Sequence, residues 1–123
     1  MNALQCPDTG GLIVVVRDDM CSFRGVTKLT GETVATFGAG CTVRWAQTQL
    51  IAAGLQLKGF GAIAEQRLGG SLSTNLHGCH QEEFSTHLRG LQAVLANGTL
   101  LDIDSADPHL AAWPGSIGTQ ASL

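Results

Sequence analysis

Apolar residues in the first third of the chain follow the pattern of β-strands. Residues 12–16 form a continuous apolar run, rich in valine, which is typical of a strand that is buried on both faces. Residues 21–29 are expected to be extended, residues 30–32 supply a turn, and residues 33–37 give the partner strand. The pattern therefore predicts a hairpin that follows one further strand.

Helical periodicity replaces the strand pattern after the Gly-Ala-Gly sequence at residues 38–40. Thr42 is expected to cap a helix that ends at Gly54. A threonine hydroxyl can accept a hydrogen bond from an N–H group of the first turn, and glycine favours helix ends. The apolar residues that share one face of this helix are Val43, Ala46, Leu50 and Ile51.

The second half of the chain combines short helical turns with another hairpin. Residues 68–75 are expected to form one or two helical turns, and residues 84–95 alternate imperfectly. Asn97-Gly98 predicts a type I′ hairpin turn, with residues 99–103 as the returning strand. Pro108 opens a short helix, because proline suits the first helical position.

Together these elements predict an α+β fold with a mixed, mostly antiparallel sheet flanked by two or three helices. With 123 residues the chain is one domain or part of one, and it is long enough to bury a core. Charged residues make up only 14% of the chain, and 16 residues are glycine. This balance suits a domain that wraps a ligand or packs on another domain, and it does not suit a disordered tail.

Charge and cysteine content limit the partners and compartments to be expected. The net charge is −3 and the lysines and arginines are scattered singly, so neither nucleic acid nor an anionic membrane is an expected partner. No targeting segment is recognised, and no apolar run is long enough to span a bilayer. The four cysteines contain no Cys-x-x-Cys motif. We expect reduced thiols in an intracellular protein, cytoplasmic or mitochondrial, with two disulfides as the alternative.

Residue types that bind metals or act in catalysis do not form a recognised motif. The metal-ligating types gathered in one region are His77, Cys79, His80 and His87, and their spacings fit no closed four-ligand zinc pattern. No Gly-x-Ser-x-Gly motif indicates a nucleophile, and no second acid accompanies Glu65. Glu65 and Arg67 are expected to pair with each other or to face water. We therefore assign no metal ligand and no catalytic residue.

The stretch from Gly59 to Gly78 is the most informative part of the chain. Three clusters of small residues, 59–62, 69–71 and 73–75, precede a His-Gly pair. Glycine lets a backbone pass close to a flat or anionic group, and hydroxyl groups can donate hydrogen bonds to it. If residues 69–74 are helical, their first N–H groups are expected to point outward toward an anion. Composition alone is equally compatible with a glycine-rich surface loop.

The order strand, Gly-Ala-Gly turn, helix, glycine-rich loop and Asn-Gly hairpin closely resembles a known cofactor domain. It resembles the second half of the PCMH-type FAD-binding domain of the vanillyl-alcohol oxidase and p-cresol methylhydroxylase family. Residues 60–74, Phe-Gly-Ala-Ile-Ala-Glu-Gln-Arg-Leu-Gly-Gly-Ser-Leu-Ser-Thr, look most like the sugar-lactone and alditol oxidase branch. The resemblance covers residues 11–123, and its strongest part is residues 59–78.

The resemblance implies FAD as the cofactor and places it beside the glycine-rich stretch. The residues that it assigns to the FAD site are Gly59, Gly61, Ala62, Ala64, Gln66, Gly69, Gly70, Ser71, Ser73, Thr74, His77, Gly78 and Ile117. Ala62 and Ala64 stand where the family commonly has serines, so two hydroxyl contacts are absent. His77 is assigned to the surroundings of the cofactor, although a lone histidine more often only satisfies local hydrogen bonds.

The resemblance also implies that residues 1–123 are a partial domain. In the family, an N-terminal lobe carries a Gly-x-Gly-His-Ser loop that holds the pyrophosphate, and a C-terminal domain covers the substrate. We expect both parts to be missing here and to be partners of this chain, which alone would turn over little or no substrate. The implied function is the FAD-binding portion of a flavin-dependent oxidoreductase acting on CH–OH groups of a sugar lactone or polyol. The alternatives are a non-catalytic remnant serving as scaffold or assembly subunit, and a nucleotide-binding module without redox chemistry.

Overall fold

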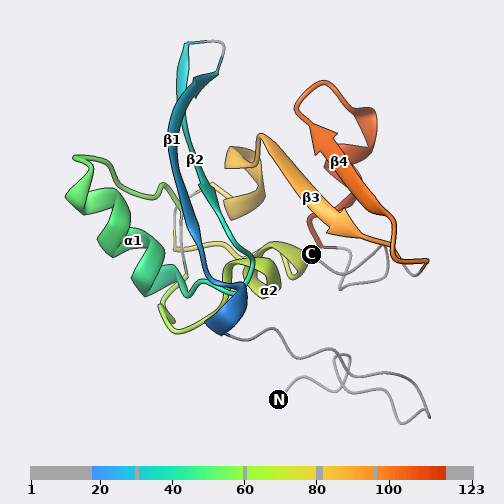
Figure 1. The fold of residues 1–123 in the computed structure, drawn as a ribbon. Coiled ribbons are helices and arrows are strands. Elements are labelled where there is room, and N and C mark those ends of the chain that lie inside the picture. The colour runs from blue at the N-terminus through green and yellow to red at the C-terminus, as the bar shows by residue number, and fades with distance from the viewer. Residues whose placement is uncertain (1–17, 30, 60, 80–81, 96, 116–123) are drawn as a thin grey trace, which may run out of the picture.

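The computed structural model describes residues 18–29, 31–59, 61–79, 82–95 and 97–115 (Figure 1). Within these residues, two antiparallel hairpins and two α-helices confirm the predicted α+β class. The hairpins, β1 with β2 and β3 with β4, form separate two-stranded sheets. The strand expected at residues 12–16 lies outside the described residues. The elements in chain order are η2 Asp18–Met20, β1 Phe23–Leu29, β2 Glu32–Phe37, α1 Val43–Ala52, α2 Leu68–Ser73, η3 Phe84–His87, β3 Gly90–Val94, β4 Leu100–Asp104 and η4 Pro108–Ala112.

The first predicted hairpin is confirmed, and aromatic rings hold its open end against α1. The register pairs Phe23 with Phe37 at that end and Leu29 with Glu32 near the turn. The rings of Phe23 and Phe37 stack with centroids 4.8 Å apart, and the Trp45 ring meets Phe37 edge-on at 6.4 Å. Aromatic pairs in these geometries stabilise a fold beyond the area that they bury. The contacts therefore fix the hairpin relative to the first helix.

Helix α1 begins and ends where the sequence predicts. The Thr42 hydroxyl accepts a hydrogen bond of 3.1 Å from the backbone N–H of Trp45, and Gly54 follows the helix with a φ of +72°. Of the four apolar residues expected on one face of the helix, Val43, Ala46 and Leu50 are buried. Ile51 is 62% exposed. It lies about 100° around the helix from Leu50, which takes it beyond the buried stripe.

The second hairpin packs around a small apolar core. Alternate residues of β3 and β4 face one side of the hairpin, as the strand period requires. The short helix predicted after Pro108 is confirmed as η4, and the indole of Trp113 that follows it is only 6% exposed. The core consists of Ala93, Ile103 and Trp113, with Leu91, Leu101 and Leu110 packed against it.

The turn between β3 and β4 differs from the predicted type I′ turn. That turn needs positive φ at both central residues, here Asn97 and Gly98. Gly98 has a φ of +82°, whereas Asn75 is the one non-glycine with positive φ among the described residues, so Asn97 does not qualify. The Gly98 N–H donates to the Leu95 carbonyl, and the Leu95 N–H donates to the Thr99 carbonyl, both at 2.9 Å. The connection between Leu95 and Thr99 therefore ends in a left-handed glycine and is not the two-residue type I′ turn.

A disulfide joins Cys21 to Cys41, so the expectation of reduced thiols is wrong for this pair. The two residues are 20 positions apart and belong to no cysteine motif, which is why their spacing did not reveal the pairing. The β1–β2 hairpin brings its two ends together, so that the Cα atoms of Cys21 and Cys41 lie 4.3 Å apart. Cys79 is free and exposed.

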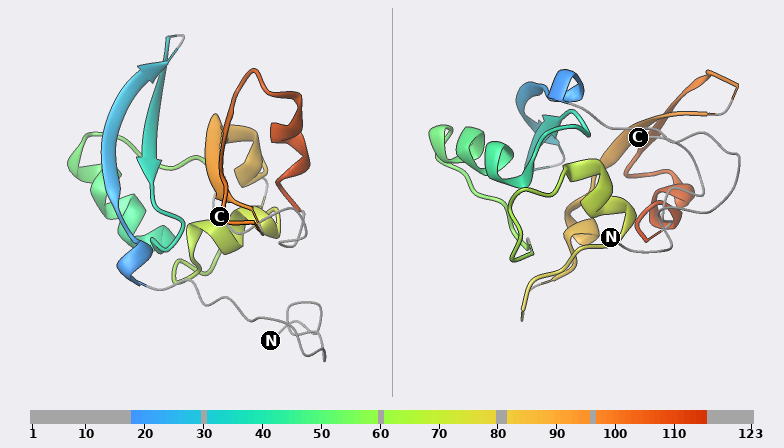
Figure 2. Two further views of the ribbon diagram at one scale, coloured as in Figure 1. Left: turned by 45° about the vertical axis from the view of Figure 1, so that its right-hand side comes forward. Right: turned by 90° about the horizontal axis from the view of Figure 1, so that it is seen from below.

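Helix α2 lies between the two hairpins (Figure 1). The β1–β2 hairpin and α1 are on one side of it, and the β3–β4 hairpin is on the other, an arrangement that the two views of Figure 2 also show. Leu72 of α2 is buried, and α2 packs against η3, which leads into β3. The helix is therefore placed by both halves of the chain. No helix in the described part of the chain is long and apolar enough to cross a membrane.

Candidate functional site

The N-terminus of α2 is held by the turn that precedes α1. The backbone N–H of Leu68 donates to the Cys41 carbonyl (2.9 Å), and that of Gly69 donates to the Ala39 carbonyl (3.0 Å). We call residues 38–41 the carbonyl turn. Because protein carbonyls accept these two N–H groups, the expectation that the first donors of this helix point outward is wrong for Leu68 and Gly69.

Arg67, the residue just before α2, adds a side-chain link to the carbonyl turn. Its Nη1 donates to the Gly40 carbonyl (2.5 Å). Glu65 does not pair with Arg67, as one of the two expected arrangements had it, but with Arg44 of α1. Both members of that pair are largely exposed, so it contributes little stability. The two arginines nevertheless tie the glycine-rich stretch to α1 and to the turn before it.

The segment that enters α2 lies across the start of α1. The backbone N–H of Val43 donates to the Gln66 carbonyl (2.9 Å), and that of Arg44 donates to the Ala64 carbonyl (2.8 Å). The N–H of Trp45 is already bonded to the capping threonine. The first three N–H groups of α1 are therefore satisfied within the protein, and this helix end is not open to an anion.

Three of the five glycines assigned to the cofactor, Gly59, Gly61 and Gly69, have a packing role within the protein. An added Cβ would lie 2.5 Å from the Glu82 carbonyl oxygen at Gly59 and 2.8 Å from a Leu76 methyl carbon at Gly61. At Gly69 it would lie 3.0 Å from a side chain of the carbonyl turn. All three glycines are buried. Their missing side chains make room for the chain itself, and not for an external group.

Gly70 is the exception and faces open space. A Cβ at this position would meet nothing within 4 Å, and the residue is exposed. Thr74, four residues on and therefore on the same helix face, is also exposed, and its hydroxyl donates to the Gly70 carbonyl (3.0 Å). Ser73 lies beside them and is partly exposed. We call Gly70, Ser73 and Thr74 the open face of α2.

The other assigned residues divide by their exposure. Exposed residues beyond the open face are Ala62 and His77, and partly exposed ones are Ala64, Gln66 and Gly78. Ile117 lies outside the described residues. Ser71 is buried with 2% exposure, and its hydroxyl has no hydrogen-bond partner. Because protein atoms enclose it, that hydroxyl is not on the open face.

Gln66 carries a second polar atom without a partner. Its Oε1 is buried and accepts no hydrogen bond, although the residue as a whole is partly exposed. A buried acceptor that lacks a donor is unfavourable, because water no longer solvates it. An amide oxygen of this kind can accept a hydrogen bond from a ligand donor that reaches it.

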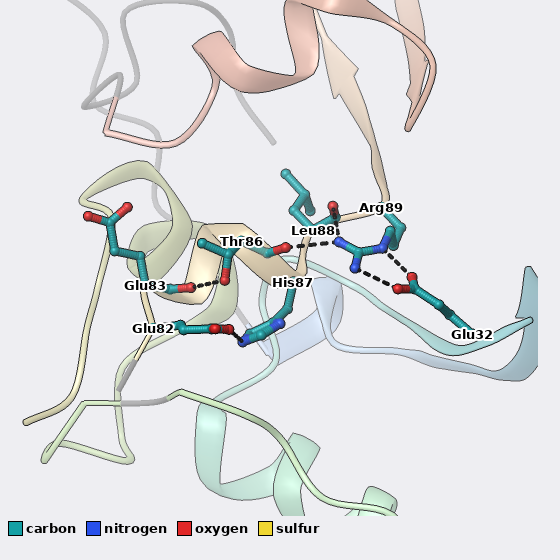
Figure 3. A network of polar contacts seen from close by, with 7 residues as sticks. All are labelled: Glu32, Glu82, Glu83, Thr86, His87, Leu88 and Arg89. Carbon is teal, nitrogen blue, oxygen red and sulfur yellow. Dashed lines mark hydrogen bonds and ion pairs between the residues drawn. The ribbon is translucent and has the colours of Figure 1, made fainter. Parts of the chain in front are cut away.

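Arg89 joins the two halves of the chain (Figure 3). Its guanidinium makes two hydrogen bonds to the carboxylate of Glu32 in β2, and it donates to the carbonyls of Thr86 (2.9 Å) and Leu88 (3.1 Å). The hydrogen bond between the two side chains is the largest cause that lowers the pKa of Glu32 below its usual 4.5 and raises the pKa of Arg89. The pair fixes β2 relative to the segment that enters β3.

A second contact in the same segment supports the start of the glycine-rich stretch. His87 Nε2 lies 3.5 Å from the Glu82 carboxylate, as Figure 3 shows. The Glu82 carbonyl packs directly against Gly59, whose φ of +63° few other residues adopt. Residues 82–89 therefore hold one end of the stretch in place and reach across to β2.

An open cleft of about 470 Å³ lies at the C-terminal end of α2. Asn75 and Glu83 line it and are hydrogen-bonded to each other at 2.8 Å. Asp107, also in the lining, accepts hydrogen bonds from the backbone N–H of His109 and contacts its ring nitrogen, and these bonds lower the pKa of Asp107. None of the described residues assigned to the cofactor lines this cleft. It is a neighbour of that site and a distinct feature.

The described residues contain no group of three or more His, Cys, Asp or Glu side chains that could hold a metal ion. His80, one of the four metal-ligating residue types in the sequence of this region, lies outside the described residues. The residues around α2 thus offer backbone, hydroxyl and amide groups, which suit an organic ligand with polar edges.

Fold and site together define a class: an α+β domain in which a glycine-rich stretch leads into a short helix with one open face. Residues 1–104 match the sequence profile of the family described as the FAD binding domain. Because the match covers most of the chain, this protein belongs to that family, the PCMH-type FAD-binding domains of flavoprotein oxidoreductases. No curated protein and no solved structure shows a significant match.

Membership in the family implies FAD as the bound cofactor, and the open face of α2 fits it. A flat ring system can approach bare backbone to van der Waals distance at Gly70, since no Cβ and no neighbouring atom occupies that space. Exposed Thr74 and partly exposed Ser73 offer hydroxyl groups on the same face. The buried glycines and Ser71 belong to the supporting structure beneath.

Proposed function

We propose that this protein is the FAD-binding portion of a flavin-dependent oxidoreductase that acts on CH–OH groups of a sugar lactone or polyol. The observation that carries the proposal is the open space at Gly70, which contrasts with the close packing at Gly59, Gly61 and Gly69. Within a helix, glycine is less stable than alanine by about 0.5–1 kcal/mol. Close packing of the flavin ring against the backbone would account for glycine at this position.

The chain's own residues would bind and orient the cofactor in distinct ways. Gly70 would provide the close backbone approach, while Gln66, Ser73 and Thr74 would supply hydrogen bonds at the edges of the ring. Ala62 has no hydroxyl to add, so the loop before α2 would contribute mainly backbone groups. Gly59, Gly61, Gly69 and Ser71 would act indirectly, by holding α2 in position.

When bound, FAD supplies the capacity to accept a hydride from a carbinol carbon, and the protein contributes binding, orientation and electrostatics. His77 is exposed, and we place it in the surroundings of the cofactor without an acid–base role. The substrate class rests on the resemblance of residues 60–74 to the sugar-lactone and alditol oxidase branch. We assign no catalytic residue to this chain.

Titration of the purified chain with FAD, followed by flavin fluorescence, tests the binding site. We expect Gly70→Leu to weaken FAD binding at least about tenfold, equivalent to roughly 1.4 kcal/mol, because the side chain would fill the space over the helix. Leucine is a better helix former than glycine, so the melting temperature should stay the same or rise. Ala52→Leu, at an exposed position of α1, is the matched control and should bind FAD like the wild type.

Two outcomes would contradict the proposal. If Gly70→Leu binds FAD as tightly as the wild type, the open face of α2 is not the cofactor site. If the wild-type chain stays colourless and resists added FAD, the scaffold or assembly role becomes the better explanation. Equal affinity for ADP and FAD would instead favour a nucleotide-binding module without redox chemistry.

The substrate class needs its own measurement on protein that holds FAD together with the partner domains. We expect sugar lactones or polyols to bleach the visible absorbance of the bound flavin under anaerobic conditions. Bleaching by a simple aromatic alcohol, with none by lactones or polyols, would overturn this part of the proposal and leave FAD binding intact.

A further inference from the structure

The Cys21–Cys41 disulfide sits at the base of the element that holds α2. Cys41 is fully buried and belongs to the carbonyl turn, whereas Cys21 is partly exposed and lies two residues before the start of β1. Two backbone hydrogen bonds run beside the disulfide, from Gly38 N–H to the Ser22 carbonyl (2.8 Å) and from Gly40 N–H to the carbonyl of the residue before Cys21 (3.4 Å). The disulfide therefore reinforces the position of the carbonyl turn covalently.

The same turn provides the acceptors for the start of α2. The Cys41 carbonyl accepts from Leu68, the Ala39 carbonyl from Gly69, and the Gly40 carbonyl from Arg67. Gly69 also packs closely against Ala39, so a shift of the turn moves the helix with it. The cross-link thus lies within two residues of each carbonyl that holds the start of α2.

We propose that the Cys21–Cys41 disulfide is a redox-controlled latch that sets the affinity of the α2 site for FAD. The inference rests on the proposed function, because it regulates the same site. With the disulfide closed, the carbonyl turn is fixed and α2 is held for the cofactor. When the disulfide is reduced, only hydrogen bonds and packing restrain the carbonyl turn. Helix α2 can then adopt other orientations besides the one that binds FAD.

A dithiol reductant can open the latch by ordinary exchange. Its thiolate attacks the Sγ of Cys21, the more accessible sulfur, so that a mixed disulfide forms and Cys41 leaves as a thiolate that takes up a proton. The second thiol of the reductant then closes its own disulfide and releases Cys21 as the second thiol. Two electrons pass from the dithiol to the protein. The Ser22 carbonyl, 3.5 Å from Cys41 Sγ, can accept the new S–H group, so the reduced pair keeps a hydrogen-bond partner.

The test uses the full chain with Cys6→Ser and Cys79→Ser, which leaves the Cys21–Cys41 pair as the only cysteines. The protein is reduced with dithiothreitol, the reagent is removed without air, and FAD is titrated by flavin fluorescence. We expect the dissociation constant for FAD to rise by roughly tenfold on reduction, within the about 5- to 150-fold range typical of coupled sites. Reoxidation should restore the original affinity.

A variant in which all four cysteines are replaced, with alanine at positions 21 and 41, provides the second readout. It should bind FAD with the affinity of the reduced protein, and this affinity should not change when dithiothreitol is added. Far-ultraviolet circular dichroism must show that reduced and variant proteins keep the folded spectrum, so that a loss of affinity is not a loss of fold.

The outcomes separate this inference from the proposed function. Equal and measurable FAD affinity in the oxidised and reduced states overturns the latch and leaves the FAD site standing. Absence of FAD binding in both states overturns the site itself. If the two thiols remain free under oxidising conditions, as thiol titration would show, the latch does not form and the inference is wrong.

Discussion

At the scale of single residues, the structure separates glycines that a sequence cannot tell apart. The dense glycines of residues 59–70 predicted a cradle for an external group. In the structure, Gly59, Gly61 and Gly69 accommodate the chain's own carbonyls and side chains, and Gly70 alone of the four faces open space. The number of glycines was therefore a good indicator of close approach, but it gave no information about what approaches.

The neighbouring glycines Gly69 and Gly70 should respond oppositely to alanine. An added methyl at Gly69 lies 3.0 Å from the Ala39 side chain, whereas one at Gly70 meets nothing within 4 Å. Gly70→Ala should stabilise the fold by about 0.5–1 kcal/mol through helix propensity alone. Gly69→Ala should be about 1–3 kcal/mol less stable than Gly70→Ala, because the buried contact is overpacked. Urea unfolding of both variants measures the difference, and equal stabilities would contradict the packing role of Gly69.

At the scale of elements, α1 was the most predictable part of the fold. Its start at Thr42 and its end before Gly54 follow from local chemistry, namely a side-chain cap and a residue that tolerates positive φ. The β3–β4 hairpin was also predictable, but its turn type was not. Asn97-Gly98 is compatible with more than one loop length, and the pairing of the strands decides which one forms.

Removal of the α1 cap should lower stability in a measurable way. Thr42→Ala leaves the backbone N–H of Trp45 without its hydroxyl acceptor, and such substitutions typically cost about 1 kcal/mol. Thermal melts should show the loss in Thr42→Ala and near wild-type behaviour in Thr42→Ser, which keeps the hydroxyl. If alanine and serine behave alike, the hydroxyl does not cap the helix in solution.

At the scale of the whole molecule, the ion pair between Glu32 and Arg89 connects segments 57 residues apart. Because Arg89 lowers the folded-state pKa of Glu32, the pair stabilises the fold fully above the usual carboxyl pKa of 4.5. This stabilisation is lost as the pH falls through the lower folded-state value. Glu32→Gln should therefore melt below the wild type at neutral pH, and the two melting temperatures should converge as the pH falls below 4.5 and through the lowered folded-state pKa of Glu32.

Arg89→Lys is the matched variant for this ion pair. Lysine keeps the positive charge but cannot make the two parallel hydrogen bonds of the guanidinium, so its melting temperature should fall between those of the wild type and Glu32→Gln. A gap between Glu32→Gln and the wild type that stays constant from neutral to acid pH would show that the pair does not carry the effect.

The candidate site was predictable in part, and the missing part is tertiary. The helical turns expected at residues 68–75 are confirmed as α2, within the glycine-rich stretch, and the assignment of FAD to this stretch stays a prediction. The acceptors that hold α2, in the carbonyl turn, lie about thirty residues earlier in the chain and were visible only as a strand-breaking Gly-Ala-Gly sequence. The disulfide that supports them depends on the return of the first hairpin, which no cysteine spacing encodes.

The positions of the two indoles give the molecule a built-in optical readout. The chain contains two tryptophans and no tyrosine, so its intrinsic emission comes from Trp45 and Trp113 alone. Trp113 is enclosed in the core of the second hairpin, while Trp45 is 37% exposed on α1. Emission from the enclosed indole should lie at shorter wavelength than emission from the hydrated one. The emissions of Trp45 and Trp113 therefore report separately on unfolding of the two halves of the chain. Energy transfer to an isoalloxazine bound between the two indoles would quench both emissions.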